Sequence, residues 1–331
     1  MYRRITLLSL TFVVAITNAQ SVKILTSGTK SSLRGLSVVS EKIIWASGSN
    51  GKIAKSLDAG NTWEWFTVPG FEKTEFRDIE AFDENEAIIM AIDSPAIILK
   101  TLNGGKNWRQ VYRNDTKGMF LDAMYFSNTE NGIVIGDPIK SEFFIAKTKD
   151  EGETWQEENY YRRPLADSGE ACFASSGTNI CVLQNKEIVF VSGGLSSHFY
   201  KNNVAFKIPI LQGKESTGAN SIASKNNKFM IIVGGDFTTK DETVKNCIIT
   251  KDAGNNWYIP TNPPTGYRSC IEYITAKKWI TCGLNGVDIT YNDGNDFNNI
   301  SKESFHTCKR AKKGNAVYLV GNNGKIGVLL L

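Results

Sequence analysis

The chain has 331 residues, of which 41% are hydrophobic and 22% are charged, with 29 glycines. This composition supports a large buried core and excludes a disordered chain. There are 38 lysines and arginines against 34 acidic residues, so a net charge of +4 gives no indication of a nucleic-acid or anionic-membrane partner.

The first segment is typical of a secretory signal peptide. Two arginines precede an apolar run over residues 5–16, and small residues precede a cleavage site expected before Gln20. We therefore expect residues 1–19 to be removed and residues 20–331 to form a single exported domain, periplasmic or extracellular. No later stretch approaches the roughly 18 apolar residues that a membrane-spanning helix needs.

An eight-residue phrase recurs along the rest of the chain. It contains Ser or Thr, then Asp or Asn, Gly and an aromatic residue at fixed spacing, and its copies begin at Ser56, Thr101, Thr148, Thr250 and Thr290. A phrase that returns every roughly 40 to 50 residues indicates a repeated supersecondary unit, as in propellers and solenoids. Its second polar residue is expected to hold a turn rather than to carry chemistry. These residues are Asp58, Asn103, Asp150, Asp252 and Asn292.

Each repeat opens with a short apolar run, continues through a strand that ends in glycine, and reaches the phrase through an alternating strand, which indicates an all-β chain. Seven openings can be aligned, at residues 33–39, 76–82, 120–126, 169–175, 218–224, 267–273 and 305–311. We predict a seven-bladed propeller. Six blades are the alternative, because residues 168–216 lack a recognisable phrase.

The two ends of the chain predict how the ring closes. The last unit stops after its third strand, and the segment that follows the signal peptide has no hairpin partner of its own. If the N-terminal strand completes the last blade, no sheet edge is left open to aggregation.

Six cysteines in an exported chain suggest disulfides. Cys172 and Cys181 lie symmetrically around a Ser-Gly turn signal, and Cys270 and Cys282 lie symmetrically around Ala276. Each pair could face across a hairpin at a separation that a disulfide spans. Buried thiols that pack as small hydrophobic side chains are the alternative.

The repeated phrase resembles the Asp-box, or bacterial neuraminidase repeat, of sialidases, sortilin-type receptors, xyloglucanases and photosystem II assembly factors. Its spacing and the amino-acid sequences of residues 33–36, 49–53 and 56–63 are most similar to those of the photosystem II assembly factor-like propellers, which include exported proteins of non-photosynthetic bacteria. The resemblance implies the propeller fold. It implies no single activity, because Asp-box propellers include glycosidases, receptors and assembly factors.

Function is therefore expected where the repeats differ, on the face where the inner strand of each blade begins. A ring of side chains is predicted there, formed by Arg34, Arg77, Leu121, Glu170, Asn220, Arg268 and His306. Loops of the same face add Asp93, Asp137, His198, Asp236, Asn285 and Asn322. Converging guanidinium groups hold carboxylate or phosphate groups with paired hydrogen bonds, so a protein segment or an anionic glycan is the expected ligand. The alternative is that each arginine pairs with a neighbouring acid.

An enzyme could use the same residues. A sialidase-like mechanism would use Tyr161 or Tyr267 as the nucleophile, activated by Glu170, and Asp137 or Asp236 as the acid. A two-carboxylate glycosidase could use two of the acids Asp137, Glu170 and Asp236. However, residues 76–79 read Phe-Arg-Asp-Ile where sialidases carry Phe-Arg-Ile-Pro, and seven units do not match their six blades.

We therefore predict a non-catalytic binding or assembly protein, with a glycosidase as the alternative. The paired glycines at residues 193–194 and 234–235 lie between strands rather than before a helix, so no dinucleotide fingerprint is present. The two histidines have no close cysteine or histidine neighbours in sequence, so neither a metal nor another cofactor is expected. A monomer is expected.

Overall fold

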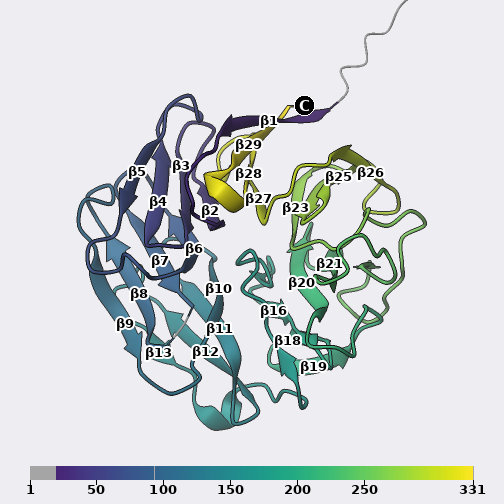
Figure 1. Cartoon of the computed structure of the whole chain (residues 1–331). Coiled ribbons are helices and arrows are strands. Elements are labelled where there is room, and N and C mark those ends of the chain that lie inside the picture. The colour runs from purple at the N-terminus through teal and green to yellow at the C-terminus, as the bar shows by residue number, and fades with distance from the viewer. Residues whose placement is uncertain (1–19, 93, 331) are drawn as a thin grey trace, which may run out of the picture.

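The computed structural model describes residues 20–92 and 94–330. These residues form seven antiparallel sheets around a central axis, which confirms the seven-bladed β-propeller (Figure 1). The helical segments among them are two single 3₁₀ turns, Tyr160–Arg162 and Asn322–Gly324. None of the helices in this part of the chain is long and apolar enough to cross a membrane. The predicted signal peptide lies outside the described residues.

Blades one to three each contain four strands, ordered from the channel outwards. Blade one has β2 (Leu33–Val38), β3 (Ile44–Gly48), β4 (Lys52–Ser56) and β5 (Glu64–Thr67). Blade two has β6 (Phe76–Ala81), β7 (Ala87–Ala91), β8 (Ala96–Thr101) and β9 (Arg109–Asn114). Blade three has β10 (Leu121–Phe126), β11 (Gly132–Ile139), β12 (Glu142–Thr148) and β13 (Gln156–Glu157). The inner strands are largely buried because neighbouring blades cover both of their faces.

Blades four to six complete most of the ring. Blade four has β15 (Ile180–Val182), β16 (Ile188–Val191), β18 (His198–Lys201) and β19 (Val204–Lys207). Blade five has β20 (Thr217–Ser224), β21 (Met230–Asp236) and β22 (Cys247–Thr250), and its inner edge is extended by β17 (Gly193–Gly194) and β14 (Glu170–Ala171). Blade six has β23 (Cys270–Thr275), β24 (Lys278–Gly283), β25 (Gly286–Thr290) and β26 (Phe297–Ser301).

Blade seven joins the two ends of the chain. It contains β27 (Thr307–Arg310), β28 (Val317–Val320), β29 (Ile326–Leu330) and β1 (Ser21–Thr26). β1 pairs antiparallel with β29, which places Ser21 opposite Leu330. The N-terminal strand thus completes the last blade, as predicted, and covers the edge of β29.

The repeated phrase forms the turn between the third and fourth strands of its blade. In the first copy the Asp58 carboxylate accepts hydrogen bonds from the Thr62 N–H at 2.8 Å and from the Thr62 hydroxyl at 2.6 Å. The Ser56 hydroxyl accepts the Gly60 N–H at 2.9 Å, and the Trp63 indole donates to the Gly60 carbonyl at 3.1 Å. The corresponding side chain accepts a backbone N–H at Asn103, Asp150, Asp252 and Asn292. These side chains hold the turns and do not approach one another.

The glycine of the phrase is required by backbone conformation and by space. Gly152 has a φ of 75°, and a Cβ at this position would lie 2.3 Å from Cδ1 of Ile88 in the neighbouring blade. Gly152→Ala is therefore expected to lower the free energy of unfolding by about 2 kcal/mol, measured by urea denaturation. Gly70→Ala is the matched control, since Gly70 has a φ of 82° but no atom within 4 Å of the added carbon. Equal losses for both variants would contradict the steric part of this explanation.

Blade four departs from the sequence prediction. Residues 169–175 do not form its inner strand: only Glu170–Ala171 is extended, and it pairs with Gly193–Gly194. The following residues enter the centre of the ring, and the short β15 takes the inner position (Figure 1). The predicted repeat register was therefore wrong for this unit, because an inserted loop precedes its first strand.

Candidate functional site

Residues 173–179, here called the channel segment, cross the central channel. The Ser175 carbonyl accepts a hydrogen bond from Arg34 of blade one at 3.0 Å, and the Ser176 hydroxyl donates to the Ser269 carbonyl beside blade six at 2.7 Å. All but the first residue of the segment are buried. The chain itself therefore fills part of the channel next to the predicted ring.

The three arginines of the predicted ring do not converge on an open pocket. Arg34 is bonded to the channel segment, and Arg77 pairs with Glu75 at 2.7 Å. Arg268 is completely buried and forms an ion pair with the equally buried Asp288. Arg77 and Arg268 are thus paired with acids, which is the alternative that the sequence left open, whereas burial and the nearby charge of Arg77 lower the pKa of Arg34. Arg268 therefore does not contribute to an open site shared by all three arginines.

Glu170 lies in a buried polar network of blade four. Its Oε1 accepts hydrogen bonds from Ser192 and from the Tyr200 hydroxyl, the latter at 2.9 Å, and lies 3.1 Å from His198 Nδ1. This contact with Glu170 raises the pKa of His198. Asp167, Glu170 and His198 form the single group in the described part of the chain that could hold a metal ion. Because the Glu170 oxygen already has several partners, the network is satisfied without an ion.

The tyrosine beside Glu170 is not one that the sequence predicted. Tyr161 is 91% exposed, and the Tyr267 hydroxyl donates to Asn220 at 2.7 Å. Tyr200 takes the predicted place, but its ring stacks on Phe190 within the core, with 4.4 Å between the ring centres. Burial and the nearby Glu170 raise the pKa of Tyr200, so its hydroxyl is not prepared to act as a nucleophile.

The other predicted residues are also satisfied locally. Asp137 accepts the Cys172 N–H at 2.9 Å, and Asp236 accepts the Thr238 N–H at 2.9 Å. The Ser175 hydroxyl donates to Asn220 at 3.0 Å, and a ring nitrogen of His306 lies 3.0 Å from the Asn322 side chain. Burial raises the pKa of Asp137 to about 6. Leu121 is buried, and Asn285 bonds to Arg268. Asp93 lies outside the described residues.

The structure does not form the predicted disulfides. Every cysteine is a free, buried thiol. Cys172 and Cys181 are not on paired strands, because the channel segment separates them and replaces the hairpin that the sequence suggested. Cys270 does face Cys282 across β23 and β24, so the predicted register of this pair was correct.

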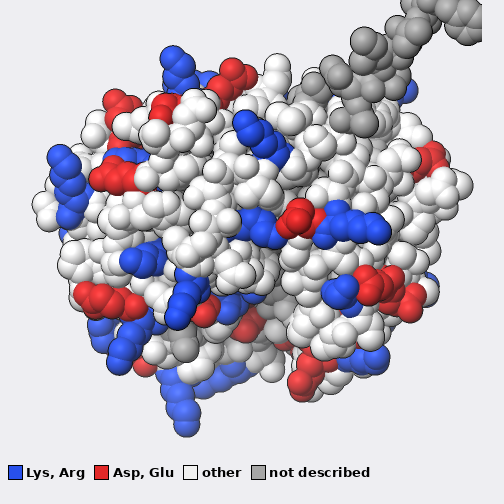
Figure 2. Space-filling model, turned by 45° about the horizontal axis from the view of Figure 1, so that its top comes forward, with Lys and Arg blue, Asp and Glu red and all other residues white. Residues whose placement is uncertain are grey.

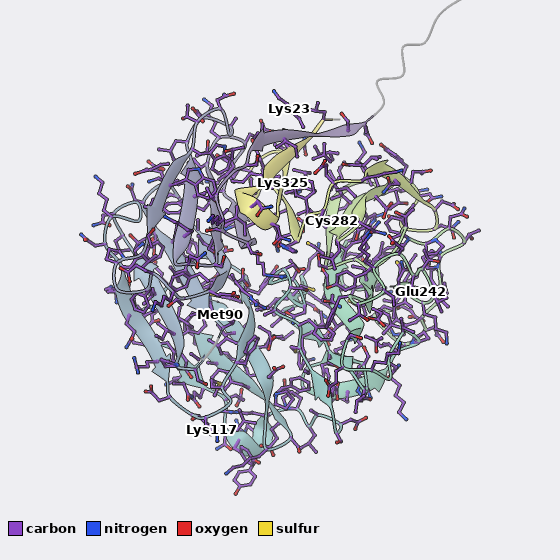
Figure 3. All side chains as sticks on the ribbon, viewed as in Figure 1. Lys23, Met90, Lys117, Glu242, Cys282 and Lys325 are labelled. Atoms are coloured by element: carbon purple, nitrogen blue, oxygen red, sulfur yellow. The ribbon has the colours of Figure 1, made fainter. Side chains whose placement is uncertain are left out.

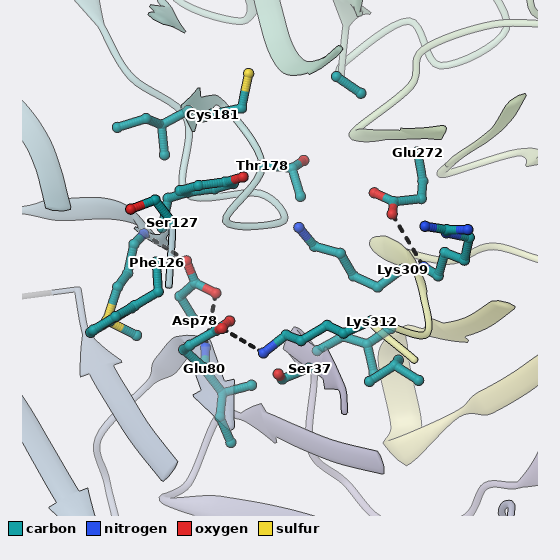
Figure 4. A pocket seen from close by; sticks show the side chains of 18 of the residues that line it. Ser37, Asp78, Glu80, Phe126, Ser127, Thr178, Cys181, Glu272, Lys309 and Lys312 are labelled. Carbon is teal, nitrogen blue, oxygen red and sulfur yellow. Dashed lines mark hydrogen bonds and ion pairs between the residues drawn. The ribbon is translucent and has the colours of Figure 1, made fainter. Parts of the chain in front are cut away.

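An open pocket lies at the other end of the channel, on the side that carries the phrase turns. Its volume is about 600 Å³, and the ends of the inner strands line it together with the turns that follow them (Figure 4). Aromatic side chains from blades two, three and six contribute to its wall, and so does a mixed set of charges. The charged residues are Asp78, Glu80, Glu272, Lys309, Arg310, Lys312 and Lys313. This cavity thus lies at the opposite end of the channel from the ring that the sequence predicted.

Lys309 is the charged residue that characterises this pocket. Its side chain extends from β27 into the cavity between Glu272 and Asp78 (Figure 4). Its ammonium group has no hydrogen bond or ion pair with the residues that the structure describes, whereas Lys312 is paired with Glu80. Burial would lower the pKa of Lys309, but the negative charge of Glu272 and of further acids outweighs burial and raises it. A permanent positive charge therefore faces the cavity.

The acids of the pocket lose charge more easily than free carboxyl groups. Burial raises the pKa of Asp78 to about 8, although its carboxylate accepts the N–H groups of Ile79 at 2.8 Å and Met124 at 2.7 Å. Burial also raises the pKa of Glu272 to about 7. Near neutral pH the basic side chains consequently exceed the ionised acids in this cavity. On the face of the molecule shown in Figure 2, by contrast, side chains of the two signs are interspersed.

Sequence reasoning missed the pocket residues. One signal was present: four of the five residues from Lys309 to Lys313 are basic, at the end of the last inner strand and just beyond it. The repeat frame places the end of an inner strand at the channel. It does not show which end of that channel stays open, because this depends on the channel segment.

Comparisons with known proteins agree with this fold. Residues 15–116 match the family described as photosynthesis system II assembly factor YCF48. A structure of YCF48 bound to D1 peptide has 16% identity and a TM-score of 0.67, with 96% of each chain covered. The chain resembles the photosystem II assembly factor propellers.

Two further structures have the same fold. YCF48 from Cyanidioschyzon merolae has 15% identity and a TM-score of 0.66, with 93% of this chain and 98% of that chain covered. The WD40 propeller domain of Doa1 has 9% identity and a TM-score of 0.62, with 94% and 97% covered. At these identities the likeness concerns the fold. No curated protein sequence matches the chain.

Proposed function

We propose that the protein is an exported, non-catalytic propeller scaffold that binds an acidic protein segment in its central pocket and acts in assembly. The proposal rests on the Lys309 ammonium group, which faces an open cavity and has no direct partner among residues 20–92 and 94–330. A likeness in fold to a YCF48 protein that was solved with D1 peptide supports a protein segment as the class of ligand. The signal-peptide pattern of residues 1–19 supports export.

The size and the chemistry of the pocket fit a short extended segment. A cavity of about 600 Å³ lies within the range of small-ligand sites, so it can hold a few residues rather than a folded domain. Phe82 and Phe126 supply apolar surface, and the excess of basic side chains favours a negatively charged partner. An anionic glycan shares the charge of such a segment but has no separate observation in its favour.

A glycosidase fits the geometry less well. The pocket is lined by none of the predicted acids, Glu170, Asp137 and Asp236. The Glu170 carboxylate instead accepts hydrogen bonds from Tyr200 and Ser192 in the core of blade four. A pair of catalytic carboxyl groups must flank one sugar bond within a shared cavity. The binding role is therefore the function that we propose.

The test is the binding of fluorescent peptides measured by anisotropy. An extended peptide of Asp, Glu and apolar residues is expected to bind, and its counterpart with Lys in place of the acids is not. Between pH 8 and pH 6 Glu272 and Asp78 gain protons and lose charge, so repulsion of the acidic peptide falls. Its affinity is expected to rise roughly fivefold, as the loss of a unit charge several ångströms away implies.

Glu272→Gln is the variant for this test, because it removes one of the two charges that titrate at the pocket wall. It should bind at pH 8 nearly as tightly as the wild type at pH 6. Glu303→Gln is the matched control, since Glu303 pairs with Lys325 away from the pocket. Equal affinity for acidic and basic peptides, or binding of sialylated or sulfated glycans alone, would contradict the proposal.

A further inference from the structure

Three thiols meet where blade six contacts blade seven. Cys270 begins β23, Cys282 lies opposite it on β24, and Cys308 lies on β27 of the last blade. All three side chains are fully buried within one apolar cluster. Figure 3 shows Cys282 on the inner side of blade six, next to blade seven. The cluster therefore bridges two blades at the point where the ring closes.

The sulfur of Cys270 is the centre of this group. It lies 3.6 Å from the sulfur of Cys308 and accepts the Cys308 N–H at 3.4 Å and the Thr178 hydroxyl at 3.6 Å. When protonated, the Cys270 thiol donates to the Cys308 carbonyl at 3.2 Å. Burial acts to raise the pKa of Cys270. Hydrogen bonds from the Cys282 and Cys308 thiols, together with the charge of Lys309, lower it well below its usual range. Such donors stabilise a thiolate, the form that reacts with disulfides.

We propose that Cys270 and Cys308 form a disulfide that joins blades six and seven. The Cys308 residue contacts the Cys270 sulfur through its thiol, its N–H and its carbonyl. The pair Cys270–Cys282, expected from the hairpin alone, would link two strands within one blade and leave the blade interface unchanged. Cys282 is then the remaining thiol of the cluster.

The reaction needs an external disulfide, such as oxidised glutathione. The Cys270 thiolate attacks one sulfur of the reagent, which breaks its S–S bond, forms a mixed disulfide and releases one thiolate. The Cys308 thiolate then attacks the Cys270 sulfur and releases the second. Two protein thiols are oxidised to one disulfide, and the reagent is reduced to two thiols. Because both sulfurs are buried, the exchange takes place while the interface between blades six and seven is open.

The position of the bond gives it a structural consequence. Blade seven is built from both ends of the chain, and its outer strand is held by the noncovalent pairing of β1 with β29. Just before β23 and β27 begin, the Ser269 hydroxyl donates to the His306 carbonyl at 2.6 Å. A covalent link between the inner strands would prevent the ring from opening at this interface.

The experiment refolds the full-length mature chain from denaturant in oxidised and reduced glutathione, then alkylates it under denaturing conditions and maps its peptides without reduction. We expect a cross-linked peptide pair that contains Cys270 and Cys308, and two fewer alkylated thiols. The melting temperature of the oxidised protein should exceed that of the reduced protein by on the order of 5 °C.

Three variants separate the outcomes. Cys308→Ala should lose both the cross-link and the temperature shift, whereas Cys282→Ala should retain them. Cys247→Ala is the matched control, because Cys247 is equally buried but packs in a different apolar cluster. Alkylation of all six cysteines after oxidative refolding, or a cross-link from Cys270 to Cys282 in the wild type, would overturn the proposal.

Discussion

Arg268→Met is expected to lower the free energy of unfolding by about 3–5 kcal/mol, because it leaves a buried carboxylate without its cation. Both side chains of the Arg268–Asp288 pair are 0% exposed. The guanidinium group also donates to Asn285 at 2.5 Å and to the Tyr267 carbonyl at 2.8 Å, so its loss breaks a network rather than a single contact. Urea denaturation followed by tryptophan fluorescence measures the change.

Arg113→Met is the control for this prediction. Arg113 and Asp115 form an exposed ion pair, which water and salt screen, so this change should stay within experimental error. The Arg268 variant also tests the ring that the sequence predicted. A variant with wild-type stability but reduced peptide affinity would show that Arg268 serves ligand binding. Reduced stability with retained affinity of the folded fraction would assign it to the core.

Lys309→Glu is expected to weaken binding of the acidic peptide about 30-fold near neutral pH, because it reverses a charge inside the cavity. Lys309→Met removes the charge but keeps most of the apolar stem, and should cost roughly fivefold. Fluorescence anisotropy at fixed ionic strength gives both values. A melting curve of each variant establishes that the ring is intact.

Lys325→Met is the matched control for the pocket. Lys325 belongs to the same blade but follows the turn at the opposite end of the channel, where it pairs with Glu303. Its replacement should leave the peptide affinity unchanged. If Lys325→Met weakened binding while Lys309→Met did not, the ligand would occupy the end that the sequence predicted.

The repeat frame was predictable because its determinants are local. Asp58 bonds to Thr62 four residues later, and Gly60 takes a backbone conformation that few other residues adopt. Turns of this kind form from a few neighbouring residues, so the phrase marks them in the sequence. The incomplete last unit similarly predicted that β1 would pair with β29.

The candidate site was less predictable because its determinants are distant in sequence. The partner of Arg268 is Asp288 on a different strand, and Ser175 reaches both Arg34 and Asn220 across the channel. No spacing in the sequence indicates these contacts. The loss of the phrase in unit four did indicate an irregular blade, but not where its extra residues go.

The sequence by itself determined the all-β class, the seven repeats and the strand that closes the ring, because short-range turn chemistry and strand periodicity specify them. Only the tertiary structure decided which end of the channel is open. That outcome depends on the channel segment, residues 173–179, which satisfies its polar groups by bonding to the inner strands of several blades. Those partners come together only when the ring has closed.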